Sequence, residues 1–270
     1  MDDRNLRVLP PILRNKYYDV ESAFTPESLL REARRQKAVP NTPVPEICIL
    51  DPDGDIVRYL RVMGRSRSVA GWVCYHSVMD RFGHGNREYG IVGCAVGASY
   101  AVLVAEQLFA SGCRLLISIT SSGQVTSLGP PPYFILIERA LRDEGTSYHY
   151  LPSGPEYAEA DKVLLEIADN ALARLGASVK RGATWTTDAP YRETAQAIRA
   201  ARAEGILAVE MEAAALYAFA EARQKSVLCF THVTNQMGQS GDFEKGEANG
   251  APASLALIRA VAEAYLAARS

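Results

Sequence analysis

The 270-residue sequence lacks an excess of charge of either sign: 29 Lys and Arg stand against 31 Asp and Glu, for a formal net charge of −2. No basic cluster points to a nucleic-acid partner, and there is no acidic tail. No apolar run reaches membrane-spanning length, and the charged, proline-containing first residues hold no apolar segment typical of a signal peptide. We therefore expect a cytoplasmic protein that binds neither nucleic acid nor a membrane.

The five cysteines are odd in number, lie far apart and form no CxxC pair. Zinc sites and disulfide frameworks are typically marked by paired cysteines at short spacings. The four histidines are scattered as well, and no GxSxG serine-hydrolase elbow is present. We expect free, mostly buried thiols and no metal site, and we expect His232 to have a structural role.

Short apolar segments alternate with amphipathic ones along most of the chain. Strands are predicted at residues 46–50, 72–79, 89–96, 115–119, 134–137, 206–209 and 227–233, with a turn at 81–86. Helices are predicted at residues 26–37 (capped by Thr25), 98–111, 161–175, 191–203, 211–223 and 252–268. The alternation predicts an α/β fold with a mainly parallel central sheet, in which residues 1–45 form an N-terminal arm and residues 46–270 the catalytic domain.

Ligands of such sheets bind at the carboxyl ends of the strands. The first predicted strand ends in Asp51-Pro52-Asp53-Gly54-Asp55, a tight turn rich in hydrogen-bond acceptors. Further polar segments follow later strands, at residues 93–99, 118–123, 210–212 and 231–235. At residues 93–99, backbone N–H groups at a helix start that hold an anion or a sugar oxygen and a glycine turn for close strand–helix packing explain the pattern equally well. The hydroxyls of residues 118–123 can donate to a ribose or phosphate oxygen, but in isolation a solvated turn explains this segment better.

Glu210-Met211-Glu212 follows a predicted strand and opens a predicted helix. One carboxylate at a helix start needs no functional explanation, because the backbone N–H groups there favour negative charge. A second carboxylate facing the end of the sheet is costly unless it binds something. Since a carboxylate can accept hydrogen bonds from both hydroxyls of a vicinal diol, this segment favours a sugar-binding site.

Taken together, these segments resemble the nucleoside phosphorylase superfamily, with its uridine phosphorylase branch as the closer likeness. Val209-Glu210-Met211-Glu212-Ala213 is the most specific part, and residues 144–152 and 187–191 are similar to further stretches of that branch. The resemblance covers roughly residues 47–270. It implies a single α/β domain with a twisted mixed sheet, partly closed into a barrel and flanked by helices, and a homodimer or a hexamer made of dimers.

The resemblance also implies roles for individual residues. Glu212 would accept hydrogen bonds from the ribose 2′- and 3′-hydroxyls, and the other ribose-binding residues would be Glu210, Met211 and Ser121. The base would be bound by Tyr191, with Pro190 as an alternative stacking residue, and by Arg192, Asn235 and Gln236. The phosphate or water site would contain Gly54, Gly97, Ser118 and Ser121. Glu212 and Asn235 are the catalytic candidates, and inorganic phosphate would be a co-substrate with no cofactor and no metal.

Two arginines that bind phosphate in this family have no counterpart here, because Ile56 and Ser118 occupy their aligned positions. A third usually comes from a neighbouring subunit, and Arg65, Arg67 and Arg81 are candidates for it. A hydrogen bond to a charged group contributes about 1.5–3 kcal/mol, so the loss of two guanidinium groups weakens anion binding by several kcal/mol.

The leading hypothesis is therefore a nucleoside phosphorylase that releases the base, with pyrimidine nucleosides as first choice and purines left open, and forms ribose 1-phosphate. The alternative is an N-ribosyl hydrolase that uses water, motivated by the two missing arginines. A third hypothesis is a nucleoside-binding protein without catalysis, motivated by Leu128-Gly129-Pro130-Pro131-Pro132 where relatives carry Val-Gly-Asp.

Overall fold

The structure is a computed structural model that describes residues 9–85, 87–176, 179–236 and 244–269. The strands are β1 (Ile47–Asp51), β2 (Ser66–Ser68), β3 (Met79–His84), β4 (Arg87–Gly93), β5 (Leu115–Gln124), β6 (Tyr133–Asp143), β7 (Tyr157–Glu159), β8 (Val179–Thr187), β9 (Ala208–Glu210) and β10 (Ser226–Gln236). The α-helices are α1 (Pro26–Lys37), α2 (Asp55–Val62), α3 (Ala98–Ala110), α4 (Lys162–Leu175), α5 (Ala195–Ala203), α6 (Ala213–Arg223) and α7 (Ala251–Ala267). Short 3-10 helices are η1 (Pro11–Leu13), η2 (Ser147–His149), η3 (Pro190–Arg192) and η4 (Glu247–Gly250).

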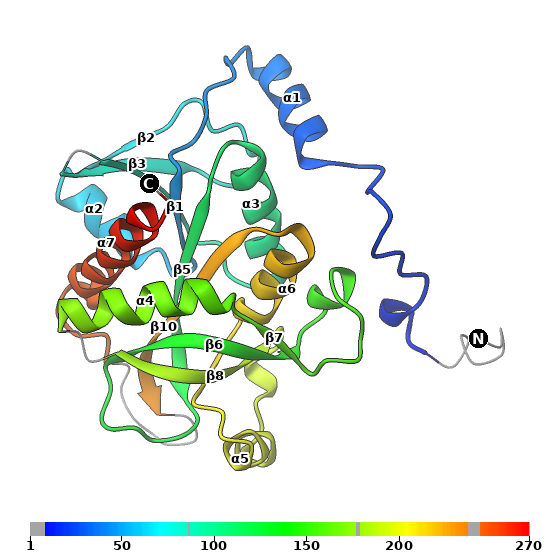
Figure 1. Ribbon diagram of the computed structural model, residues 1–270, viewed down its shortest axis with the longest axis vertical. Coiled ribbons are helices and arrows are strands. Elements are labelled where there is room, and N and C mark those ends of the chain that lie inside the picture. Colours follow the sequence, from blue (N-terminus) through cyan, green and yellow to red (C-terminus); the bar gives the residue numbers. More distant parts are fainter. Residues whose placement is uncertain (1–8, 86, 177–178, 237–243, 270) are drawn as a thin grey trace.

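All the strands belong to one mixed sheet with the order β10-β6-β8-β9-β5-β1-β4-β3-β2, and β7 pairs with β6 (Figure 1). Because β10 also pairs with β5, the strands β10, β6, β8, β9 and β5 form a closed ring. The pairs of β1 with β4 and β5 are parallel, whereas β3 and β4 form an antiparallel hairpin. The expectation of a mixed sheet partly closed into a barrel and flanked by helices is therefore confirmed.

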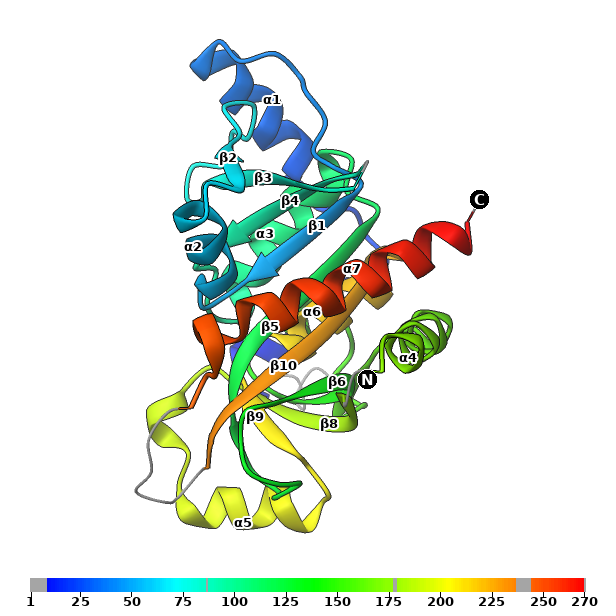
Figure 2. The ribbon, with the colours of Figure 1, turned by 90° about the vertical axis from the view of Figure 1, so that its left-hand side faces the viewer.

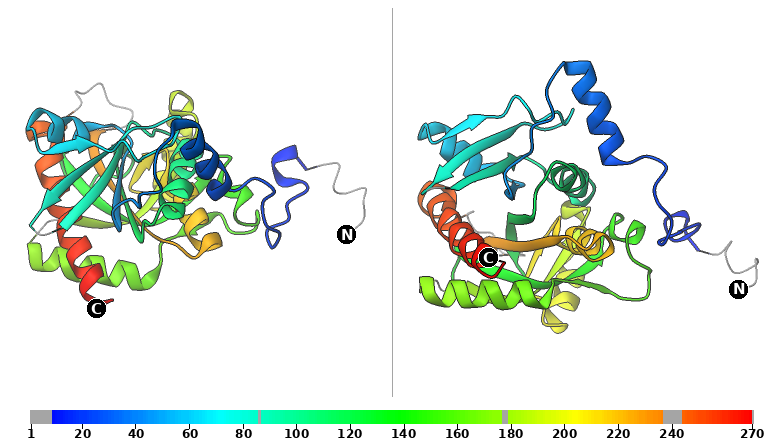
Figure 3. Two further views of the ribbon diagram at one scale, coloured as in Figure 1. Left: turned by 90° about the horizontal axis from the view of Figure 1, so that it is seen from above. Right: turned by 45° about the horizontal axis from the view of Figure 1, so that its top comes forward.

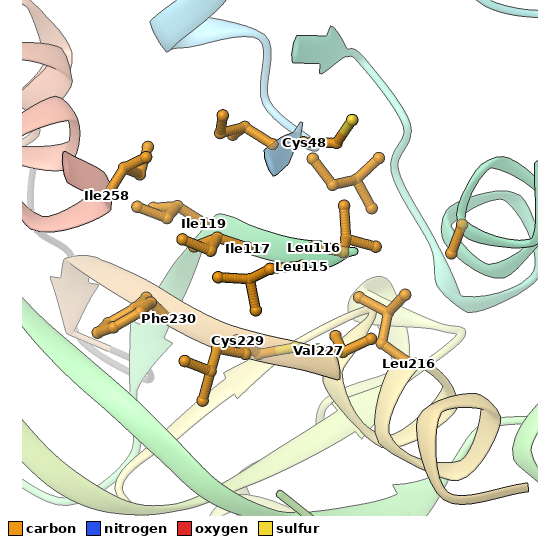
Figure 4. Close-up of a cluster of buried hydrophobic side chains, with 14 of the residues drawn as sticks. Cys48, Leu115, Leu116, Ile117, Ile119, Leu216, Val227, Cys229, Phe230 and Ile258 are labelled. Atoms are coloured by element: carbon orange, nitrogen blue, oxygen red, sulfur yellow. The ribbon is translucent and has the colours of Figure 1, made fainter. Parts of the chain in front are cut away.

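Strand β5 lies at the centre of the core and is covered on both faces. Figure 2 shows α7 lying across β5 and β10. In Figure 4, Ile119 and Phe230 lie toward Ile258 of α7, whereas Val227 lies toward Leu216 of α6. Burial of both faces explains why β5 begins as a continuous apolar run rather than as an alternating pattern.

The N-terminal segment lies on the side of the molecule away from α7 (Figure 3). Helix α1 begins as expected, with Thr25 Oγ1 accepting a hydrogen bond from the N–H of Ser28 at 3.2 Å. Its buried residues Leu30 and Ala33 form a small cluster with Val73. Within the described residues, no helix combines the length and apolar character needed to cross a bilayer.

Two local predictions in the first half of the domain are wrong. Residues 72–78 form no strand, because Trp72 follows a turn closed by its N–H to the carbonyl of Val69 and packs into the main core, while Val73 packs against α1. Residues 81–84 form no turn, because β3 continues to His84 and pairs with β4 along its whole length.

The Ser/Thr segment at residues 118–123 also differs from expectation, because it lies inside β5 instead of following it. The strand continues to Gln124 by pairing with β10, and Thr231 Oγ1 donates to the carbonyl of Thr120 at 3.1 Å. Side chains of a strand alternate between its two faces. The hydroxyl groups are therefore divided between two sides of the sheet rather than gathered in one turn.

Helix α6 is tied to the barrel by the hydroxyl of Tyr217, a fully buried side chain. This hydroxyl donates to the carbonyl of Ile137 at 2.6 Å and accepts from the N–H of Cys229 at 3.0 Å. We predict that Tyr217→Phe lowers the free energy of unfolding by about 1–3 kcal/mol, because two buried backbone groups lose their partner. Urea denaturation measures this, with exposed Tyr17→Phe as a control expected to change little; equal midpoints for the two variants would contradict it.

Candidate active site

Glu210 lies at the end of β9 and accepts four hydrogen bonds. Its Oε2 accepts from the N–H groups of Glu212 and Ala213 at 2.7 and 2.8 Å. Its Oε1 accepts from the hydroxyls of Thr184 and Thr186 at 3.1 and 2.5 Å. Burial raises the pKa of Glu210, and these donors partly offset the rise. Glu210 thus fixes the start of α6 and the backbone of Glu212.

Glu212 is almost completely buried, with 1% of its surface exposed, but is only partly satisfied. Its Oε1 accepts from the N–H of Gly97 at 2.7 Å. Oε2 has no partner at hydrogen-bond distance among the described residues, although the nearby hydroxyl of Thr120 lowers the pKa of Glu212. Burial, and next the nearby carboxylate of Glu210, raise the pKa of Glu212 to about 8. A buried acceptor without a donor is costly, and hydroxyl donors would relieve that cost. Glu212 is therefore suited to accept from a diol.

The turn between β1 and α2 is organised by Asp51, which is buried. Its carboxylate accepts from the N–H groups of Gly54 and Val57 at 3.1 and 2.9 Å. Burial raises the pKa of Asp51 to about 7. Gly54 has a φ of +75°, and a Cβ there would lie 2.7 Å from the Sγ atom of Cys94. The N–H of Gly54 is thus occupied within the chain, and the turn packs directly on the segment that follows β4.

The carboxylate of Asp53 in the same turn binds Ser121 through both oxygens. Oδ2 accepts from the N–H of Ser121 at 2.6 Å, and Oδ1 accepts from its hydroxyl at 2.8 Å. The charge of Asp53 also raises the pKa of Glu212 and of His232. A carboxylate therefore occupies the two donors that the resemblance assigned to the nucleophile.

Two cations lie beside this carboxylate. Lys245 Nζ is 2.6 Å from Asp55 Oδ2 and 4.0 Å from Asp53 Oδ1. Arg58 Nη2 donates to Asp55 Oδ1 at 2.8 Å and to the carbonyl of Asp53 at 2.6 Å. Both cations are thus paired with Asp55. Together with Asp53, this cluster holds at least as many carboxylates as cations.

The candidates for a third arginine lie on the β2–β4 part of the sheet. Arg67 and Arg81 both pair with Glu88, at 2.9 and 3.4 Å. Ser118 does not lie beside Asp53 either. It comes three residues before Ser121 in β5, so its side chain points to the opposite face of the sheet.

The residues expected to bind the base lie only partly close together. Gly123 of β5 pairs with Val209 of β9 on one side and with Asn235 of β10 on the other. Asn235 of β10 and Glu210 of β9 therefore lie on the two strands that flank β5. Tyr191 in η3 is fully exposed in the single chain, and its neighbour Arg192 is also exposed. Met211 is partly buried between the two glutamates, and the side chain of Gln236 lies outside the described part of the structure.

His232 of β10 is buried and lies directly across the ladder from Ser121. Its ring stacks on Phe134, with ring centroids 4.5 Å apart and an interplanar angle of 12°. Burial lowers the pKa of His232, and nearby Lys245 lowers it further. In the described residues, no group of three or more His, Cys, Asp or Glu side chains is arranged to hold a metal ion.

Comparison with known proteins places this arrangement in a family. A family model described as the phosphorylase superfamily matches residues 73–265. The chain belongs to the phosphorylase superfamily. Its fold is similar to that of a uridine phosphorylase from Vibrio fischeri ES114, with a TM-score of 0.68 and 21% sequence identity over 83% of this chain and 94% of that one. No curated protein matches the sequence.

The resemblance inferred from the sequence is thus confirmed, including the similarity of the fold to uridine phosphorylase. Four residues of this superfamily member were not singled out by sequence as parts of the site. Asp53 was one acceptor among several in its turn, and Arg58 lies two residues beyond the aligned Ile56, one turn into α2. Lys245 comes from a distant segment, and His232 was expected to be structural. Only the pairing of β5 with β10 and the packing of α2 bring the four together.

The contrasting hydrogen bonding of the two glutamates predicts different effects of Glu→Gln substitution in this superfamily member. The folded-state pKa of Glu212 lies above its ordinary value of 4.5, at about 8, so its contribution to stability is fully present below pH 4.5 and is lost as pH rises to about 8. We predict that Glu212→Gln removes this decline in the free energy of unfolding with rising pH.

Glu210→Gln is the matched variant. It weakens the acceptor of two buried N–H groups, so we predict a loss of about 1–3 kcal/mol at pH 5. Burial raises the pKa of Glu210 as well, so we expect a smaller loss at pH 8. Urea midpoints of the wild type and both variants at the two pH values provide the measurement. The assignment fails if the difference between wild type and Glu212→Gln is the same at both.

Proposed function

We propose that the chain cleaves the N-glycosidic bond of a nucleoside and that the nucleophile is water. The observation that carries this proposal is the Asp53 carboxylate, which occupies both donors of Ser121. A phosphate dianion at the same donors would meet a negative charge at hydrogen-bond distance, and its desolvation needs free cationic donors. A water molecule there would instead meet a group that can accept its proton.

The reaction proposed here divides the work among three side chains. Glu212 accepts from the 2′- and 3′-hydroxyls of the ribose and holds the sugar. As the bond to the base breaks, positive charge develops on the ribose. Water attacks C1′ and loses a proton to Asp53, while the bond's electron pair leaves with the base. Asn235 donates a hydrogen bond to the base anion, which then takes up a proton from solvent. The products are the free base and ribose, and the proposal involves no cofactor.

We take a pyrimidine nucleoside as the first substrate to test. The similarity of residues 187–191 to the base-binding stretch of the uridine phosphorylase branch supports this choice, with Tyr191, Arg192 and Gln236 as proposed base-binding residues. A purine nucleoside is the second choice. A homodimer or a hexamer is part of the proposal, because Tyr191 is fully exposed in the single chain and a second copy would shield it.

Phosphorolysis, as in the family's nucleoside phosphorylases, is the second candidate function. Lys245 and Arg58 favour it, because both lie beside Asp53 and could face an anion if the carboxylate moved away from Ser121. Cleavage would then yield ribose 1-phosphate. The third candidate is binding of a nucleoside without turnover.

Base release with and without phosphate separates these candidates. We predict that a panel of pyrimidine and purine nucleosides yields free base and ribose at the same rate in phosphate-free buffer as with phosphate, because no free anion site is needed. Chromatography of base and sugar products measures this. Strict dependence on phosphate with formation of ribose 1-phosphate would establish the second candidate, and binding with no product would establish the third.

Asp53→Asn tests the carboxylate itself. The amide oxygen can still accept from Ser121, but it cannot take a proton, so we predict a fall in kcat of about 10²–10⁴-fold with little change in KM. Glu212→Gln is the matched control, because loss of a ribose contact should raise KM as well. An Asp53→Asn variant with unchanged phosphate-free turnover would remove Asp53 from the mechanism.

A further inference from the structure

His232 lies beside the Asp53–Ser121 pair, although it is not part of the reaction proposed above. In the β5–β10 ladder His232 is the partner of Ser121. Neighbouring strands lie about 4.8 Å apart, and paired residues of a parallel ladder place their side chains on the same face. The imidazole therefore lies next to the hydroxyl that donates to Asp53 at 2.8 Å.

The imidazole ring is held in place by two neighbours. It stacks on Phe134 of β6. Gly250 also lies against the ring: it has a φ of +76°, and a Cβ there would lie 2.4 Å from Cε1. The start of α7 thus has no side chain where His232 needs room, and the ring has little freedom to turn.

The charged groups that act on the imidazole come from two other segments. Asp53 and Asp55, in the turn before α2 and at its start, raise the pKa of His232, while Lys245, which precedes η4, lowers it. Burial is the largest influence and also lowers the pKa. The imidazole is therefore neutral at neutral pH and can accept a proton, with a carboxylate nearby to stabilise the cation that forms.

We propose that His232 acts with Asp53 as a proton relay for the nucleophilic water, an inference that rests on the proposed hydrolysis. The water O–H bond breaks as its oxygen bonds to C1′, and the proton passes to the Asp53 carboxylate. The proton then moves to neutral His232, which restores the carboxylate for the next turnover and later releases the proton to solvent. His232 acts through Asp53 and is thus a positioning residue.

The ionisation of His232 tests the pair directly and does not require activity. Among the four histidines of the chain, His232 is the buried one, so His76, His84 and His149 serve as internal references in an NMR titration. We predict that Asp53→Asn lowers the pKa of His232 by about half a unit or more, whereas Lys245→Met raises it. Comparison with His232→Gln assigns the resonance. If neither substitution shifts the pKa of His232, Asp53 and His232 do not act as a pair.

The pH profile of nucleoside cleavage tests the role of the pair. We predict that His232→Gln lowers kcat at least about tenfold and abolishes the acid limb that reflects protonation of the imidazole, and that Lys245→Met moves this limb to higher pH. Phe134→Leu is the control, because it loosens the ring yet keeps the imidazole and should keep the limb. An unchanged profile in His232→Gln overturns the relay. If the pKa shifts occur but no nucleoside is hydrolysed, the proposed function fails while the ionising pair stands.

Discussion

The pairing of β5 with three other strands is the constraint on which the remainder of the site depends. Its first half pairs with β1, its whole length pairs with β10, and its last two residues pair with β9. These pairings close the barrel, and they set Ser121 beside both the turn that follows β1 and His232 of β10. Without this ladder, the turn after β1, the two glutamates before α6 and His232 would not lie at the same edge of the sheet.

The site concentrates carboxyl groups that a purely structural edge would avoid. Glu210, Glu212 and Asp51 are all buried, and burial raises the pKa of each. Glu210 and Asp51 are compensated by backbone N–H groups, which give them a structural explanation. Asp53 accepts from both donors of Ser121, whereas Glu212 keeps an oxygen without a hydrogen-bond partner among the described residues. That buried oxygen is where a hydroxyl group of a ligand would complete the hydrogen bonding.

Membership of the phosphorylase superfamily constrains the fold more tightly than the chemistry. The ribose contact proposed for Glu212 at the start of α6 suits any cleavage of a ribosyl bond, whichever nucleophile is used. In the proposed hydrolysis, the nucleophile depends on the turn after β1, where Asp53 binds Ser121 and the nearest cations pair with Asp55. On that proposal, a few side chains in one turn decide which nucleophile the same sheet accommodates.

The sequence by itself determined the α/β class, helices such as α1, α3 and α4, and the glutamate segment before α6, because these depend on local periodicity, capping and a contiguous motif. It did not determine β8, whose polar residues become a strand through pairing with β6 and β9, or the continuation of β5 through its Ser/Thr segment. Nor did it show that Asp53, Lys245 and His232 meet. Those contacts join segments far apart in the chain, so only the closure of the barrel and the packing of α2 and α7 decide them.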